Sequence, residues 1–290
     1  MLSRSAGAAL ASLTLACAAL GACASGPATA SAWGFCAPPE ALPVAWREDP
    51  APPDASRGEQ IAALLGVSQE VRQAGEATAR LVVLERLALT RTVLDATVAE
   101  LDCERERTLQ IAALLHAKKE RTTTRFTIAS IVEGAATTIV AGVLTSADTS
   151  PTSQGLVAVG GGTLAAGLAL VPLFDRPQVE LAHARNVLAD VWLGPRVSRW
   201  FPPVVWAYLT RPQFSNEQAR SIRENVVARW KEHDLQRGAF DRATLFGARG
   251  LYDAQALDLR AAMLAQIKAE VRLMNQELSP LLVRQRQDAR

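Results

Sequence analysis

Length, composition and charge exclude several classes of protein. The chain has 290 residues, of which 49% are apolar and 21% are charged, so it can bury a substantial core and is not intrinsically disordered. Lys and Arg together number 31 against 29 Asp and Glu, which leaves no large field of one sign to attract nucleic acid. Aromatic residues make up only 5% while Ala and Leu are abundant, which favours helices over sheets. We therefore expect an all-α protein that does not bind nucleic acid.

Residues 1 to 22 have the pattern of a secretory signal. One positive charge, Arg4, precedes an Ala- and Leu-rich run that ends in small residues, and the run is too short to cross a membrane as a helix. It ends in the four residues LGAC, with Cys23 last. This sequence resembles the lipobox of bacterial lipoproteins.

The lipobox resemblance implies that Cys23 carries a diacylglyceryl group and begins the mature chain. The next residue is Ala24 rather than the Asp of inner-membrane retention, so the resemblance implies an anchor in the outer membrane, facing the periplasm. Two alternatives stay open. One is acylation at Cys17, where Thr14 stands in place of the expected Leu, and the other is a signal that is cleaved without lipidation.

Cysteine usage then predicts one disulfide. Processing at Cys23 leaves Cys36 and Cys103 as the remaining thiols of an exported chain. Because the periplasm is oxidising, we expect these two to be bridged; the alternative is two free thiols. The bridge would close a loop of about 68 residues and contribute roughly 4 kcal/mol on the chain-entropy model.

Two segments lead from the signal to the middle of the chain. Residues 23 to 55 are rich in Ala and Pro, which is typical of an extended tether. From 56 to 125, apolar residues recur at helical spacing without a proline, which predicts a long amphipathic helix with possible breaks at Gly66 and Gly75. Its clustered charges alternate in sign, which favours a solvated coiled-coil face over a binding patch.

Residues 126 to 174 form the most unusual stretch, because their only charges are Glu133 and Asp148. Two apolar arms, at about 126 to 144 and 156 to 174, flank a polar turn. Small residues four apart line one face of each arm and let two backbones approach closely: Ser130, Gly134, Thr138 and Gly142 in the first, and Ala158, Gly162 and Ala166 in the second. The pattern resembles the glycine-zipper hairpins of bacterial envelope proteins.

Residues 175 to 290 are expected to form a helical region. We predict a helix over 179 to 193 and a long amphipathic helix at about 252 to 283. A capping box at Ser215 and Gln218 predicts a further helix that runs to about residue 233.

The stretch from 192 to 214 gathers six aromatic residues. We interpret it as a buried corner around Pro202 and Pro203; the alternative is an aromatic belt at a membrane interface.

No set of residues predicts catalysis. His116, His183 and His233 lie far apart without metal-ligand spacing, and we interpret each as a partly exposed helix residue. Neither a nucleophile elbow nor a phosphate-loop lysine occurs. Residues 160 to 165 match the dinucleotide pattern G-x-G-x-x-A but lack the surrounding strand-helix-strand unit. We expect no metal and no cofactor.

Together these patterns predict a non-enzymatic, lipid-anchored protein of the bacterial outer membrane. Its expected fold is an elongated helical bundle or coiled coil with a glycine-rich apolar helical hairpin, which inserts in the membrane as transmembrane helices or mediates self-association. The expected partners are membrane lipid, through acylated Cys23 and the hairpin, and further copies of the chain. The alternative is an α-helical pore-forming protein, since a long helix, an apolar hairpin and long return helices resemble the layout of helical-bundle toxins. An envelope hydrolase has no candidate nucleophile or base.

Overall fold

The computed structural model describes residues 28–29, 36, 47–52, 54–73, 76–146, 176–183, 185–217, 219–234 and 242–287. Within its helices and strands, the side chains of residues 28, 29, 133, 134, 137, 139–146, 233, 234 and 284–286 are not described. The described residues are mostly helical, with three short strands that form one small sheet.

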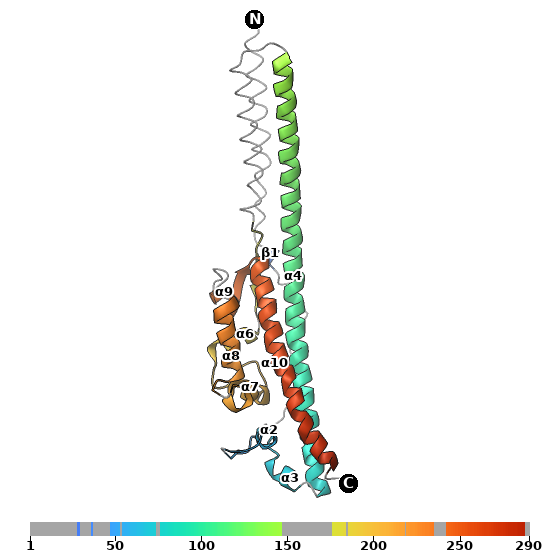
Figure 1. Cartoon of the computed structure of the whole chain (residues 1–290), viewed down its shortest axis with the longest axis vertical. Coiled ribbons are helices and arrows are strands. Elements are labelled where there is room, and N and C mark those ends of the chain that lie inside the picture. The colour runs from blue at the N-terminus through green and yellow to red at the C-terminus, as the bar shows by residue number, and fades with distance from the viewer. Residues whose placement is uncertain are drawn as a thin grey trace.

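Two long antiparallel helices form the axis of the molecule (Figure 1). The first, α4, is a continuous helix of 70 residues at Ala77–Ser146, and the second, α10, has 34 residues at Ala254–Gln287. Two contacts show that they are antiparallel, because Asp102 pairs with Lys268 whereas His116, further along α4, contacts Asp258 near the start of α10. The prediction of a helix at about 252 to 283 is confirmed.

The seam between α4 and α10 is apolar. Buried side chains recur every three or four residues along both helices, as expected for the core-facing stripe of an amphipathic helix. Three threonines of α4 are also buried. Their hydroxyls can leave water because each donates to the carbonyl four residues earlier, at 2.7 Å for Thr90. The buried apolar residues of the seam include Val83, Leu87, Leu94, Leu101, Ile111 and Leu115 of α4, and Leu257, Leu264, Ile267, Val271, Met274 and Leu278 of α10.

Two short helices precede α4 and pack at its first turns: α2 at Arg57–Leu65 and α3 at Ser68–Arg72. A capping box between Ser56 and Glu59 begins α2. Gly66 ends it with φ 67°, a left-handed conformation that favours glycine. The predicted break at Gly66 is therefore confirmed.

Several short elements pack against α10 on the side away from α4 (Figure 1). Their aromatic side chains form a buried corner in which the rings of Phe201 and Trp206 stack with centroids 5.6 Å apart. The interpretation of residues 192 to 214 as a buried corner is confirmed. In chain order the elements are α6 at Val187–Leu193, α7 at Pro203–Thr210, the 3-10 turn η2 at Pro212–Phe214, α8 at Ile222–Arg229, the π-helical turn η3 at Trp230–Asp234 and α9 at Arg242–Phe246.

A small sheet joins three distant parts of the chain. Strand β1 at Ala28–Thr29 pairs in parallel with β2 at Val179–Ala182, and β2 pairs antiparallel with β3 at Arg249–Tyr252. Because Tyr252 is followed at once by α10, the sheet lies at the end of the body where α10 begins.

The prediction of one helix over 179 to 193 is wrong. Its first four residues form β2, in which Val179 and Leu181 are buried and alternate with more exposed neighbours. That period of two is a strand pattern, and pairing with β3 satisfies the backbone polar groups that a helix would otherwise pair internally. The helix that follows, α6, begins only at Val187.

The predicted capping box at Ser215 is also wrong. The Ser215 hydroxyl accepts from the backbone of Glu217 and the side chain of Asn225 rather than capping a helix. The box that begins α8 lies six residues later, between Ser221 and Glu224. Both positions match the S-x-x-E/Q pattern, so the pattern alone does not choose between them.

Candidate functional site

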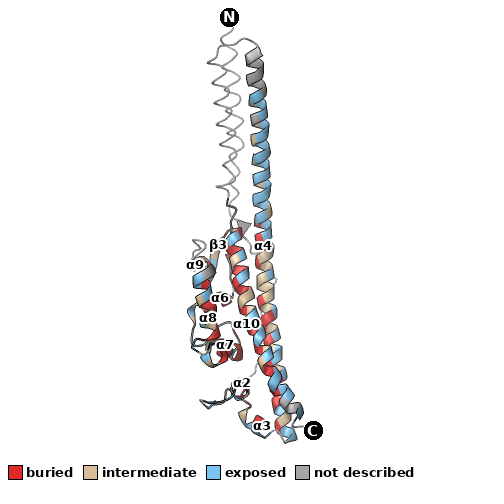
Figure 2. Cartoon of the chain, viewed as in Figure 1, coloured by how far each residue is buried: buried red, intermediate tan, exposed pale blue. Residues whose placement is uncertain are grey.

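The candidate site is the part of α4 that extends beyond the body, residues 116–146, which we call the α4 extension. Leu115 is the last buried residue of α4, and none of the described side chains after it is buried (Figure 2). The hydrogen bond between His116 and Asp258, 2.9 Å long, marks the level at which α10 begins. From Leu115 to Ser146 the helix rises about 46 Å.

Apolar side chains on the extension are strongly exposed. Ile131 is 64% exposed and Val132 62% exposed, and Ile128 is similar. On a helix in water, such side chains contribute none of the free energy that burial would provide. Adjacent exposed apolar residues of this kind make the extension a candidate contact surface.

Three hydroxyl side chains of the extension bond to their own helix. The hydroxyls of Thr122 and Thr123 donate to the carbonyls of Lys118 and Lys119, and that of Ser130 donates to Thr127, at 3.2, 3.0 and 2.8 Å. A hydroxyl satisfied in this way does not require water. The extension can therefore enter an apolar environment without leaving these groups unpaired.

The small residues of the predicted packing face are placed only in part. Ser130 and Thr138 lie on the extension, and Thr138 is exposed. Gly134 and Gly142 lie on its helical backbone. The second arm lies outside the described residues, with Ala158, Gly162 and Ala166. In the part of the chain that is described, none of the helices combines the length and hydropathy needed to cross a membrane.

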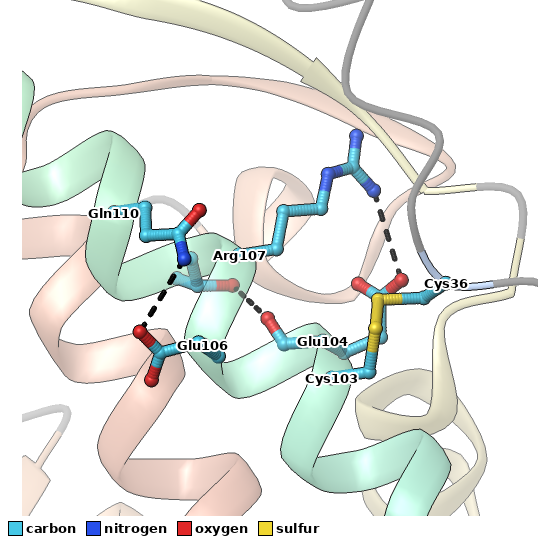
Figure 3. Close-up of a disulfide and its surroundings, with 7 residues drawn as sticks. Cys36, Cys103, Glu104, Glu106, Arg107 and Gln110 are labelled. Atoms are coloured by element: carbon cyan, nitrogen blue, oxygen red, sulfur yellow. Dashed lines mark hydrogen bonds and ion pairs between the residues drawn. A yellow bond between two sulfur atoms is a disulfide. The ribbon is translucent and has the colours of Figure 1, made fainter.

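The N-terminal segment is joined to α4 by a disulfide at the edge of the body (Figure 3). Cys36 and Cys103 are bonded, with their Cα atoms 5.8 Å apart. The neighbouring Glu104 pairs with Arg107 at 3.6 Å. Cys23, the expected site of acylation, lies outside the described residues.

The run of charges at 102 to 107 differs from the solvated face that was predicted. Asp102 pairs with Lys268 and Arg272 of α10, and the side chains of Glu104 and Arg107 are only 19% and 15% exposed. Asp102, Glu104 and Arg107 therefore belong to the packed junction between α4, the disulfide and α10, whereas Glu106 is exposed as predicted.

A buried polar cluster, which the sequence did not reveal, supports the sheet end of the body. Arg260 of α10 is 1% exposed, and its guanidinium donates to the Asn186 side chain at 3.2 Å and to the Leu245 carbonyl at 3.3 Å. Arg260 lies within the apolar stripe of α10, between Leu257 and Leu264. A charge on the core face of an amphipathic helix is the signal that could have identified it.

His183 belongs to the same cluster, which corrects its interpretation as a partly exposed helix residue. It is 7% exposed, and its Nε2 lies 2.8 Å from the hydroxyl of Tyr252. That hydroxyl donates to the Thr244 carbonyl at 2.5 Å, so its oxygen accepts from Nε2, which therefore carries a proton. Burial, with the charges of Arg260 and Arg107, lowers the pKa of His183 to about 2.

The pKa of His183 predicts a loss of stability in acid. Below the ordinary pKa of 6.5 the unfolded chain binds a proton at His183 that the folded chain does not bind until about pH 2. The free energy of unfolding should therefore fall by about 1.4 kcal/mol per pH unit below pH 6.5. Urea unfolding between pH 7 and pH 5 measures this slope, which His183→Gln should reduce. An equal slope in parent and variant would contradict a neutral buried imidazole.

Comparison with known proteins does not assign the chain to a family. No protein-family model matches the chain, and no curated protein or solved structure is detectably similar to it. Within the described residues, no group of three or more His, Cys, Asp or Glu is placed to hold a metal ion.

Proposed function

We propose that this chain is a lipid-anchored protein of the bacterial outer membrane with a structural or assembly role rather than a catalytic one. Its α4 extension inserts into the membrane or packs against further copies of the chain. The observation that carries the proposal is that the extension, which continues α4 beyond the level where α10 begins, exposes apolar side chains.

The length of the extension supports contact with a membrane. From Phe126 to Ser146 the apolar part rises about 30 Å, which is long enough to reach deeply into a hydrocarbon layer of about 30 Å. Its small residues would let the second arm or another copy approach closely. Insertion as a packed hairpin, with α4 and α10 as a coiled coil below it, therefore suits this chain better than insertion as an isolated helix.

The position of the tether supports the same orientation. Strand β1 begins at Ala28 and lies in the sheet, at the end of the body where α10 begins and the extension leaves it (Figure 1). An extended chain from Cys23 to Ala28 covers at most about 18 Å. A lipid on Cys23 and the α4 extension would therefore enter the membrane from the same end of the body.

Photocrosslinking at one residue of the extension tests this function. A photoreactive benzoylphenylalanine in place of Ile131 should form adducts with lipid, or with a second copy of the chain, when the full protein is irradiated in cells. The matched control places the same residue at Leu193, which is 74% exposed on the body and should form neither adduct. Mass spectrometry of the adducts distinguishes the two outcomes.

The outcomes separate the competing functions. Lipid adducts at position 131 support insertion, and adducts with the chain alone support self-association. Adducts with neither, or equal lipid adducts at positions 131 and 193, would contradict the proposal. Release of dye from loaded vesicles by the parent chain would favour the alternative, an α-helical pore-forming protein.

A further inference from the structure

Basic side chains gather where the α4 extension leaves the body. Lys118, Lys119, Arg121 and Arg125 are all exposed, and Glu120 is the single acidic residue among them. We call these four basic residues the collar. Sequence alone favoured a solvated coiled-coil face for residues 118 to 121, but α10 begins near His116, so the collar lies beyond the helix that would pair with it.

The collar occupies the level that a membrane surface would occupy. It begins two residues after His116, whose partner Asp258 lies near the start of α10, and it ends directly before the apolar residues that begin with Phe126. Eight helical residues rise about 12 Å. The headgroup layer on each side of a bilayer is at most about 8 Å thick. The collar is therefore long enough to cover the full depth of that layer.

We propose that the collar binds the phosphate groups of anionic phospholipids and so holds the sheet end of the body against the membrane surface. This inference rests on the proposed function, because it requires the extension to meet a membrane. Arg121 and Arg125 present planar guanidinium groups that pair with phosphate oxygens through two hydrogen bonds, and the lysines add compact positive charges.

The i, i+3, i+7 spacing of Lys118, Arg121 and Arg125 strengthens the argument. Residues at these positions lie on one face of a helix, so three positive charges are directed to the same side. Leu114, Ile128 and Val132 continue that face below and above, and all three are exposed. Within the extension, this face therefore changes from basic to apolar, as a segment that crosses a membrane surface does.

Vesicle charge tests the collar directly. The full chain, without acylation and with benzoylphenylalanine at Ile131, is irradiated with vesicles of phosphatidylcholine alone or with about one third phosphatidylglycerol. We expect lipid adducts at much lower vesicle concentration in the anionic mixture. The triple variant Lys119→Gln, Arg121→Gln, Arg125→Gln should raise the half-maximal anionic vesicle concentration by on the order of 100-fold at low salt.

A control variant that loses the same number of positive charges distinguishes the effect of the collar from an effect of net charge. The triple variant Arg72→Gln, Arg91→Gln, Arg196→Gln removes three exposed positive charges from the body and should behave as the parent does. Equal adduct formation on both lipid mixtures, or an equal loss in the two triple variants, would overturn the collar while leaving insertion intact. Absence of lipid adducts on every vesicle would overturn the proposed insertion itself, and the collar with it.

Discussion

Replacing both Cys36 and Cys103 with serine is expected to lower the free energy of unfolding by about 4 kcal/mol. The disulfide joins residues 67 apart in the sequence, so its loss frees a long loop in the unfolded chain. In a body of this size the midpoint of thermal unfolding should fall by roughly 10 °C. Urea and thermal unfolding followed by circular dichroism measure both quantities.

Reduction provides the control for the disulfide. Dithiothreitol should destabilise the parent by the same amount and leave the double serine variant unchanged. Alkylation adds an independent check, because a bridged pair in the unreduced, denatured protein does not react. Equal alkylation of Cys36 and Cys103 in that sample would show that the mature protein carries free thiols.

Asn186→Ala should destabilise the body by about 3–5 kcal/mol, because it removes three buried hydrogen bonds and leaves the Arg260 guanidinium with fewer partners. The Asn186 amide donates to the carbonyls of Leu245 and Gly247 at 2.9 and 2.8 Å, and its oxygen accepts from Arg260 at 3.2 Å. Alanine removes all three hydrogen bonds in a place that is 5% exposed, where water does not readily replace them. Urea unfolding measures the loss.

The same substitution at an exposed site is the control for Asn186. Asn216 lies exposed in a turn, so Asn216→Ala should change the free energy of unfolding by less than about 0.5 kcal/mol. Adding Arg260→Met to Asn186→Ala should recover part of the stability, because it removes the buried charge that has lost its Asn186 partner. A double variant that is less stable than Asn186→Ala would show that Arg260 is stabilised by other contacts.

Local patterns predicted the helical elements with the strongest signals. The apolar stripe from Leu257 to Leu278 is long enough to distinguish a helix from a strand, and α10 matches it. Gly66 marked a helix end because its left-handed backbone favours glycine. By contrast, residues 179 to 182 are too few to distinguish a short buried strand from the first turn of a helix.

The candidate site was recognised from the sequence by its composition but not by its position. The scarcity of charge after Phe126 and the small residues at Ser130 and Gly134 singled out the apolar arm. That the arm continues α4 without interruption, and that α10 begins near His116, required the structure. These facts place the collar at the base of the extension.

By itself, the sequence determined the helical class of the protein and the two cysteines that remain after the expected processing, because composition and counting need no knowledge of the fold. It also determined the course of the last helix, since an amphipathic stripe depends only on neighbouring residues. Only the tertiary structure decided that residues 28–29, 179–182 and 249–252 form one sheet and that Arg260 is buried beside Asn186. Strand pairing and charge burial join residues far apart in the chain, and the spacing of apolar residues within a short segment does not reveal such contacts.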